Sequence, residues 1–381
     1  MRVVQVNAGV DERVKDPEEL LARCFTLRGW SEALVEAGAR SVGVVQRFHR
    51  DATIVRNGVR YLFRRRGVAA AVRHGAVPDL VHVNGLIFPA CVWRLRRAVP
   101  DDRAIVVQDH GNRLDAERRG VVRGVRHALW RRGLRSADAF LFTATGQAAS
   151  WRRAGLISTS QQTYTALEAG TAFRAVPRAA ARQATGVSGS PALLWVGRLD
   201  ANKDPLTVLG GFERALAMLP NARLTMVYGD DTLLAEVNTR IAASSALEGR
   251  VRLAGAVPHE RMPEFYSAAD IFVAGSHHEG SGYALLEACA CGAVPVVTDI
   301  PSFAAITANG SLGATWTPRD AEAFARALAE VSSRDLSALG RRVSDHADRA
   351  FRWPAVGRRA MAIYREVIAR RRARLTTRPA A

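Results

Sequence analysis

The sequence predicts an α/β protein of about two domains, each built on a sheet of parallel strands. At 381 residues the chain is longer than one domain of ordinary size. Short apolar runs such as 192–196 and 270–274 are typical of strands buried in a parallel sheet. From 270 to 297 the pattern indicates strand, loop, helix, turn and strand, the repeating unit of such a sheet.

Composition limits the class of protein. Hydrophobic residues make up 48% of the chain, as in an ordinary soluble globular protein. There is no apolar run of about 18 residues, so no membrane-spanning helix is expected. Because a strand is expected directly at 2–6, no signal peptide is visible. We expect a cytoplasmic protein, with a peripheral position at the inner membrane face as the alternative.

The charge is strongly basic, at a formal net +18. Only Lys15 and Lys203 are lysines, so arginine supplies the remaining 52 of 54 basic residues. The arginines occur in both halves and no nucleic-acid-binding motif is found, so nucleic acid is not expected as a partner. A basic helix at 117–135 could lie on an anionic membrane. A core-packed helix with a solvated arginine face is the favoured interpretation.

Cysteine usage argues against a metal or redox site. The cysteines are scattered, and the last two are separated by one residue, which suits neither a zinc site nor a C-x-x-C pair. They are expected to be small buried residues in a reducing compartment. The four are Cys24, Cys91, Cys289 and Cys291.

The first domain is expected over 1–175. Its strands are predicted at 2–6, 41–46, 59–63, 79–84, 104–108 and 139–143, and its helices at 18–37, 117–135 and 147–154. Polar residues follow three of these strands, namely Asn7, Asn84 and His110. Because function in open α/β sheets gathers at the carboxyl ends of strands, these three are candidate site residues.

The second domain is expected over 190–350, after an Ala-, Arg-, Gly- and Ser-rich linker at 174–190. It opens with the strand 192–196, and a further strand is predicted at 224–228. Helices are predicted from Pro263, at 320–331 and at 352–371, and the tail after them is expected to be mobile. The segment 351–381 is expected to form a third part of the chain, a C-terminal helix and a tail.

The stretch 277–295 carries the main functional signal. Residues 279–282 have little side-chain bulk and precede a helix over 283–290, which ends at Gly292 before Pro295. A phosphate could approach the first-turn amides of that helix. Glu279 and Glu287 could lie about 10 Å apart, one for a sugar and one for a ribose. Ordinary solvated glutamates are the alternative, but the apolar neighbours of Glu287 require a partner for its charge.

At these residues the chain resembles glycosyltransferase family 4, retaining enzymes of GT-B architecture. The resemblance rests on a Glu-x7-Glu motif followed by Gly and Pro-Val-Val, and on Gly-Arg-Leu-x-x-x-Lys at 197–203. The matching residues of the first motif are Glu279, Gly280, Gly282, Glu287, Ala288, Ala290, Gly292, Pro295, Val296 and Val297. The sequence departs at Ser281, where an aromatic is usual, and at Gly275, where proline is usual. It also departs at 168–171, where the family has a Gly-x-Asp turn.

The resemblance implies two doubly wound Rossmann-like domains facing a cleft, with a C-terminal helix that crosses back to the first domain. It implies that Arg198 and Lys203 hold the donor's pyrophosphate. His110 would contact the donor sugar, Glu279 its hydroxyls and Glu287 the ribose. By the same resemblance, the strand and loop at 252–258 would line the base. The other implied substrate-binding residues are Gly9, Asn84, Gly255, Val257, Gly280, Ser281, Gly282, Tyr283 and Ala284.

The expected function is therefore transfer of a sugar from a nucleoside-diphosphate sugar to a hydroxyl acceptor, with retention and without metal or other cofactor. The alternatives are another GT-B enzyme, such as a nucleotide-sugar epimerase or a phosphorylase, and a non-catalytic nucleotide-sugar binding protein. The polar insert 10–17 suggests an unusual acceptor, but the sequence specifies neither donor, acceptor nor oligomeric state.

Overall fold

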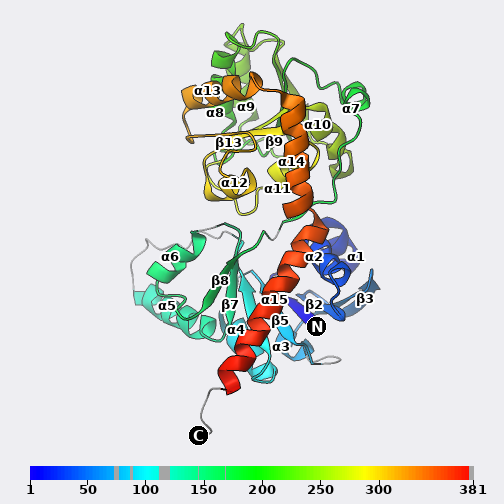
Figure 1. Ribbon diagram of the computed structural model, residues 1–381, viewed down its shortest axis with the longest axis vertical. Helices are drawn as coiled ribbons and strands as arrows, with labels where there is room; N and C mark the ends of the chain where they lie inside the picture. Colours follow the sequence, from blue (N-terminus) through cyan, green and yellow to red (C-terminus); the bar gives the residue numbers. More distant parts are fainter. Residues whose placement is uncertain (73–76, 86–88, 111–120, 145, 168, 377–381) are drawn as a thin grey trace. The chain divides into compact units, whose positions relative to one another are not determined.

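The computed structural model describes residues 1–72, 77–85, 89–110, 121–144, 146–167 and 169–376. The chain divides into two compact units (Figure 1). Unit 1 comprises Met1–Gly170 and Trp353–Ala381, and unit 2 comprises Thr171–Arg352. Each unit is an α/β layer structure around its own sheet, so the predicted fold class is confirmed.

Unit 1 contains an eight-stranded sheet of order β3-β4-β2-β1-β5-β6-β7-β8, parallel except for the β3–β4 hairpin. Its strands are β1 (Arg2–Asn7), β2 (Ser41–Arg47), β3 (Ala52–Arg56), β4 (Val59–Arg64), β5 (Leu80–Asn84), β6 (Ala104–Gln108), β7 (Ala139–Phe142) and β8 (Gln162–Thr165). Its helices are α1 (Pro17–Arg23), α2 (Phe25–Glu36), α3 (Val68–Ala71), α4 (Pro89–Ala98), α5 (Val121–Leu134), α6 (Gln147–Arg153) and α15 (Trp353–Thr376).

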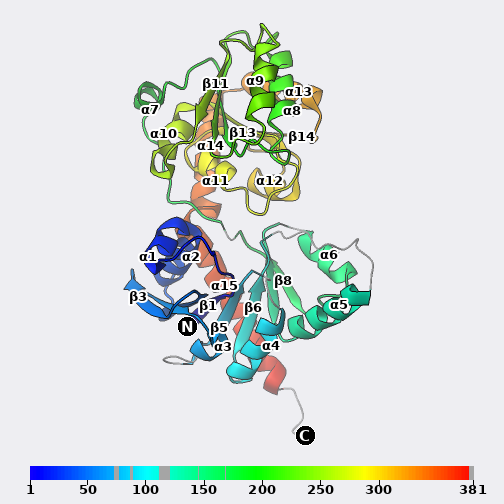
Figure 2. The same cartoon turned by 180° about the vertical axis from the view of Figure 1, so that it is seen from behind.

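Alternate residues of these strands face two helical layers. Val42 and Val106 belong to the core shared with α2 and α15, whereas Val45 and Val107 belong to the core shared with α4 and α6. This period of two is what a strand buried on both faces requires. Figure 1 shows α15 across one face of the sheet, and Figure 2 shows α3 and α4 on the other.

The helices α15 and α2 pack closely because each has a glycine where it contacts the other. A Cβ at Gly357 would lie 2.2 Å from the carbonyl oxygen of Ala33, and one at Gly29 would lie 2.1 Å from the ring of Trp353. Both contacts therefore need glycine, because real Cβ atoms do not approach so closely. The C-terminal segment is in this way built into the core of unit 1.

Unit 2 contains a six-stranded, fully parallel sheet of order β11-β10-β9-β12-β13-β14. Its strands are β9 (Ala192–Gly197), β10 (Arg223–Tyr228), β11 (Val251–Gly255), β12 (Ile271–Ala274), β13 (Val294–Thr298) and β14 (Ala314–Trp316). Its helices are α7 (Arg178–Thr185), α8 (Pro205–Ala215), α9 (Leu234–Ala242), η1 (His259–Arg261), α10 (Met262–Ala268), α11 (Tyr283–Ala290), α12 (Pro301–Ile306), α13 (Ala321–Ser332) and α14 (Leu336–Ala350).

Two local expectations are corrected, and some strands were missed. The linker expected at 174–190 contains α7, which is held to unit 2 because Arg178 and Arg182 both pair with Asp270, at 2.9 and 2.8 Å. The single helix expected at 18–37 is broken at Cys24, whose ψ of 63° is not helical. The strands β3, β8 and β14 were not predicted.

Other expectations agree with the structure or lie partly outside it. Cys24, Cys289 and Cys291 are free, the last two buried. The expected basic helix 117–135 is described only from Val121, as α5, and Glu168 lies outside the described residues. Within the described ranges, no helix is both long and apolar enough to cross a membrane.

Each sheet has one point where the strand order reverses. In unit 2 the chain builds outward from β9 to β11, then returns to place β12 on the other side of β9. In unit 1 the reversal lies between β1 and β5. Loops at such a switch point diverge and leave room for a ligand at the carboxyl ends of the strands.

Candidate functional site

The loops after β9 and β12 meet at the switch point of unit 2. The His277 amide donates to the carbonyl of Asn202 at 2.8 Å, and the Asn202 side-chain amide donates to the carbonyl of His278 at 3.0 Å. These reciprocal hydrogen bonds join loops that are more than seventy residues apart in sequence. They bring the two predicted motifs together.

Lys203 and Glu279 form an ion pair where the loops meet. The Lys203 ammonium donates to Glu279 Oε1, and the two side chains are only 20% and 15% exposed. Partial shielding from water strengthens the attraction between such charges. A lysine ammonium has three N–H donors, so Lys203 can hold this carboxylate and still donate to a second anion.

The helix α11 begins beside this pair. Its N-cap, Gly282, has φ of +63°, and a Cβ there would lie 2.9 Å from the Phe303 ring. Glycine is therefore required at this position for two reasons, the positive φ and the close approach of the Phe303 ring. Because Gly282 has no side chain, the N-cap supplies neither hydroxyl nor carboxylate to the first turn. Tyr283 and Ala284, which begin the helix, are partly exposed.

Arg198 has a different partner. Its side chain is 62% exposed, and its guanidinium pairs at 3.0 Å with Asp200 in its own loop. The structure therefore brings Lys203 to Glu279 but directs Arg198 to a different carboxylate.

Glu287 has the partners that its apolar setting requires. It is 5% exposed, its Oε2 accepts from the Tyr266 hydroxyl at 3.0 Å, and its Oε1 lies 2.8 Å from His259 Nε2. Tyr266 is buried and binds this carboxylate through its hydroxyl. His259 was missed. Its only signal was its place just after Pro258, beside the residues expected to line the base.

The loop expected to line the base is accessible. Gly255 closes β11 with φ of +69°, and a Cβ there would meet no atom within 4 Å. Val257 is partly exposed, and the side chain of His259 is 48% exposed. The ring of Phe173 lies 4.8 Å from that of His259, measured between centroids.

The His259–Glu287 pair predicts a pH-dependent stability. The hydrogen bond that His259 donates to Glu287 raises the pKa of His259 above its usual 6.5, against a smaller opposing effect of burial. The stabilisation is therefore complete below about pH 6.5 and is lost as pH rises through the raised pKa. We expect His259→Gln to lower the melting temperature more at pH 5.5 than at pH 8.5. A difference that is independent of pH would contradict the charged pair.

Unit 1 gathers neutral polar groups at its own switch point. Asn7 ends β1 and is 8% exposed, and Asn84 ends β5. The carbonyl of Gly9 accepts a hydrogen bond from Gln46 Nε2 at 2.8 Å. His110 follows β6 and lies against Gly85, where a Cβ would be 3.1 Å from His110 Cδ2.

His110 is an uncharged group at neutral pH. Burial lowers its pKa to about 4. A neutral imidazole has one donor and one acceptor nitrogen, which suits a hydroxyl better than a phosphate. The structure thus places Gly9, Asn84 and His110 at the ends of neighbouring strands of unit 1, as the sequence predicts.

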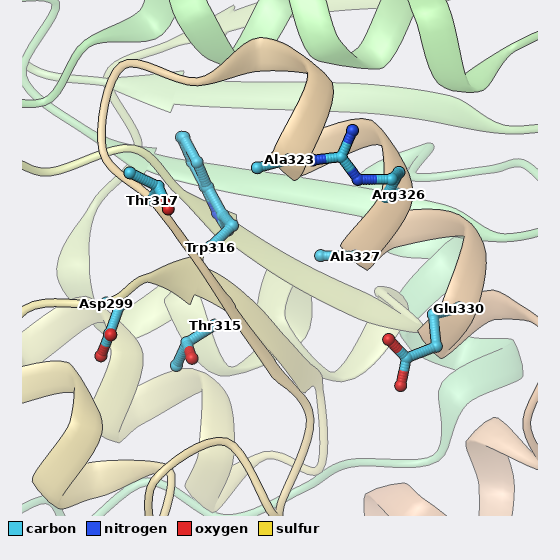
Figure 3. A pocket seen from close by; sticks show the side chains of 8 residues that line it. All are labelled: Asp299, Thr315, Trp316, Thr317, Ala323, Arg326, Ala327 and Glu330. Atoms are coloured by element: carbon cyan, nitrogen blue, oxygen red, sulfur yellow. The ribbon is translucent and has the colours of Figure 1, made fainter.

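Two further observations concern where a metal ion or another ligand could bind. Within the part of the chain that the structure describes, no three His, Cys, Asp or Glu residues are grouped so as to hold a metal ion. A hollow of about 280 Å³ lies between α13 and β14. Figure 3 shows it lined by Arg326 and Glu330 of α13 and by Asp299 and Thr315. None of its lining residues is a predicted site residue.

Part of the chain is similar in sequence to known proteins. Residues 178–347 match the family model "Glycosyl transferases group 1". D-inositol 3-phosphate glycosyltransferase of Thermobispora bispora is 29% identical over 208 residues, 52% of this chain and 48% of that protein. Mannosylfructose-phosphate synthase of Agrobacterium fabrum is 36% identical over 124 residues, 31% of this chain and 27% of that protein. The chain thus spans about half or less of the length of these relatives.

Solved structures share the fold of nearly the whole chain. Sucrose-phosphate synthase of Thermosynechococcus elongatus has a TM-score of 0.71 at 20% identity, covering 97% of this chain and 100% of that one. Anabaena Alr3699/HepE in complex with UDP has a TM-score of 0.69 at 15% identity, covering 96% and 100%. The matched segment contains Lys203, Glu279 and Glu287. Residues 178–347 are therefore similar to the glycosyl transferases group 1 family, within a chain that has the fold of these solved proteins.

Proposed function

We propose that the protein is a glycosyltransferase that moves a sugar from a nucleoside-diphosphate sugar to a hydroxyl acceptor. The observation that carries the proposal is the Lys203–Glu279 pair at the switch point of unit 2, directly before α11. A cation, a carboxylate and a helix N-terminus here suit a diphosphate with a sugar attached. The similarity to the group 1 family over the same residues supports it.

The proposed rate acceleration is electrostatic. Breaking the anomeric C–O bond places about one extra negative charge on the leaving diphosphate. A cation about 4 Å away, at an effective dielectric near 20, contributes about 4 kcal/mol as an upper figure. Even half of this corresponds to more than tenfold in rate. Lys203 and the first turn of α11 would supply this stabilisation, preorganised before the reaction.

The remaining residues have proposed roles in binding. Glu279 would accept hydrogen bonds from hydroxyls of the donor sugar, and neutral His110 would contact that sugar as well. Glu287, held by Tyr266 and His259, would accept from the ribose. Arg198 is exposed enough to exchange Asp200 for a phosphate. Gly255 and Val257 would line the base.

For the acceptor we propose unit 1, where Gly9 and Asn84 lie at the switch point between β1 and β5. In the proposed reaction the acceptor oxygen forms its bond to the anomeric carbon on the same face of the sugar from which the leaving phosphate departs. The acceptor's proton passes to a phosphate oxygen, and the anomeric configuration is retained. NMR of the product's anomeric proton tests this, since an inverted product would contradict the mechanism.

The reaction is proposed to need no metal, because Lys203 and α11 already supply positive charge to the leaving group. We expect transfer in excess EDTA to proceed at about the rate found with added Mg²⁺. The measurement is the initial rate of nucleoside-diphosphate release. Loss of activity in EDTA that returns with Mg²⁺ would contradict this part of the proposal.

A panel of donors gives the primary test. Thermal shift with UDP-glucose, UDP-N-acetylglucosamine and GDP-mannose should identify a ligand, because binding to the native state raises the melting temperature. Release of nucleoside diphosphate that depends on an added acceptor would then establish transfer. Release without acceptor specificity, or conversion of the donor to its epimer, would favour another GT-B enzyme. Binding without consumption would favour a non-catalytic binding protein.

Contact with an anionic membrane is a second candidate property, and it is compatible with a cytoplasmic enzyme. In the described part of α5, Leu129 is 61% exposed, and the neighbouring Arg131 and Arg132 are exposed. An exposed apolar side chain beside exposed arginines is one element of an interfacial helix. Sedimentation with anionic liposomes at low and high salt tests it, since electrostatic binding weakens as salt screens the charges.

A further inference from the structure

The geometry points to His277 as a positioning residue that holds Asp204, and with it the adjacent Lys203, against the loop that carries Glu279. The role of Lys203 in catalysis rests on the proposed function, but the positioning of its side chain can be tested without it. His277 belongs to neither motif by which the chain resembles known enzymes.

His277 and Asp204 join the two loops through their side chains. His277 Nε2 lies 2.8 Å from Asp204 Oδ2, and the two side chains are 19% and 14% exposed. Asp204 is also the N-cap of α8, where it accepts from the Thr207 amide at 3.2 Å and from the Thr207 hydroxyl at 2.8 Å. One carboxylate therefore fixes the start of α8 and receives the contact from the β12 loop.

Arg319 faces the other nitrogen of the imidazole. Its Nη2 lies 3.5 Å from His277 Nδ1, and a guanidinium can only donate. We therefore assign Nδ1 as the acceptor and Nε2 as the donor, so the N–H of Nε2 points at Asp204. In this tautomer both nitrogens of the ring are used to hold it in place.

The backbone is also constrained at the two residues whose side chains His277 contacts. Asp204 and Arg319 have positive φ, of 45° and 67°, although neither is glycine. Such conformations persist only where the surroundings determine them, and they concentrate at functional sites. His277 contacts both residues, so it is part of what holds them.

Gly275 explains why the loops can approach so closely. A Cβ at Gly275 would lie 2.9 Å from Val208 Cγ2, 3.0 Å from the carbonyl oxygen of Asp204 and 3.2 Å from that of Lys203. The end of β12 thus rests directly on the backbone of Lys203 and Asp204. A side chain at this position would meet these atoms, so the close approach of the two loops requires glycine. His277, two residues further on, completes the contact.

Lys203 and Lys15 are the only lysines, which makes a direct readout available. In protein labelled with ¹³C,¹⁵N-lysine, side-chain signals come from these two residues alone, and Lys15 is an internal reference in unit 1. We expect His277→Ala to shift the Lys203 signals and to leave those of Lys15 in place. His277→Gln can still donate to Asp204 and should restore most of the wild-type position. His346→Ala, in α14 with its ring against Phe351, is the matched control and should change neither signal.

The kinetic arm uses a double-mutant cycle. His277→Ala should lower kcat/KM at least about tenfold, the scale of loss when a catalytic group is slightly misplaced. In a Lys203→Ala background the same change should cost less than about threefold, because its effect acts through Lys203. His277→Gln should recover most of the activity.

The outcomes distinguish the positioning role of His277 from the proposed function. Unshifted Lys203 signals in folded His277→Ala protein would overturn the inference, as would equal losses in both backgrounds. A shifted Lys203 signal in a protein that binds none of the donors would support the positioning role and contradict the proposed function. If His277→Ala does not fold, His277→Gln and His277→Asn carry the test. Their Lys203 signals should then differ by how well each amide reaches Asp204, and identical spectra would overturn the inference.

Discussion

Lys203→Ala is expected to lower kcat/KM for sugar transfer at least about tenfold with the fold intact. The substitution removes the cation that would face the leaving diphosphate, a contact made strongest in the transition state. It also leaves Glu279, whose side chain is only 15% exposed, without its partner and free to repel the incoming anion. Both effects act in the same direction, so this is the largest loss that we expect from one side chain.

The chain offers a matched control for this measurement. Lys15→Ala removes the only other lysine, an exposed side chain in unit 1, and should leave kcat/KM unchanged. Lys203→Arg should restore only part of the activity, because a planar fork replaces a compact charge. Equal activity of Lys203→Ala and the wild type, with matching melting temperatures, would remove Lys203 from the mechanism.

Glu279→Gln is expected to separate binding of the sugar from binding of the diphosphate. Loss of the carboxylate should lower kcat/KM at least about tenfold, because the hydroxyls of the donor sugar lose a charged acceptor. The same change frees Lys203 from its ion pair. The nucleoside diphosphate alone should therefore bind at least as tightly to the variant as to the wild type.

Calorimetry with the nucleoside diphosphate, beside steady-state kinetics with the sugar donor, distinguishes these effects. Glu264→Gln, which removes the partner of Arg261 in an exposed pair of unit 2, is the matched control and should change neither quantity. If Glu279→Gln lost affinity for the diphosphate and for the donor to the same extent, Glu279 would be a structural partner of Lys203 and not a contact of the sugar.

The sequence was most informative where strands and motifs coincide. Apolar runs located β9 and β12, and the motifs directly after them contain Lys203 and Glu279. Because parallel strands end on the same edge of a sheet, the sequence order of these elements was enough to bring the two residues together. The need of Glu287 for a partner followed from its apolar neighbours alone.

What the sequence did not provide were contacts between distant side chains. Tyr266 and His259 reach Glu287 across 21 and 28 positions, and no local pattern links them. The helix α7 was mistaken for a linker because its Ala- and Arg-rich sequence, which favours a helix, was grouped with the Gly- and Ser-rich residues 186–190 that follow it. Its docking depends on Asp270, about ninety residues later.

One missed element did have a local signal. The hairpin of β3 and β4 turns at Asn57 and Gly58, whose φ values are 49° and 77°. Asn-Gly between apolar segments is the strongest short-range sign of such a turn. With that signal taken into account, β3 is predictable. The break at Cys24 is different, because no glycine or proline marks it.

The most direct test of the account is a structure determined with a bound nucleoside diphosphate, UDP or GDP as the donor panel selects. The diphosphate should lie at the first-turn amides of α11, with the Lys203 ammonium within hydrogen-bond distance of a phosphate oxygen and the ribose at Glu287. A nucleotide bound elsewhere, with the Lys203–Glu279 pair unchanged and no phosphate at α11, would contradict it.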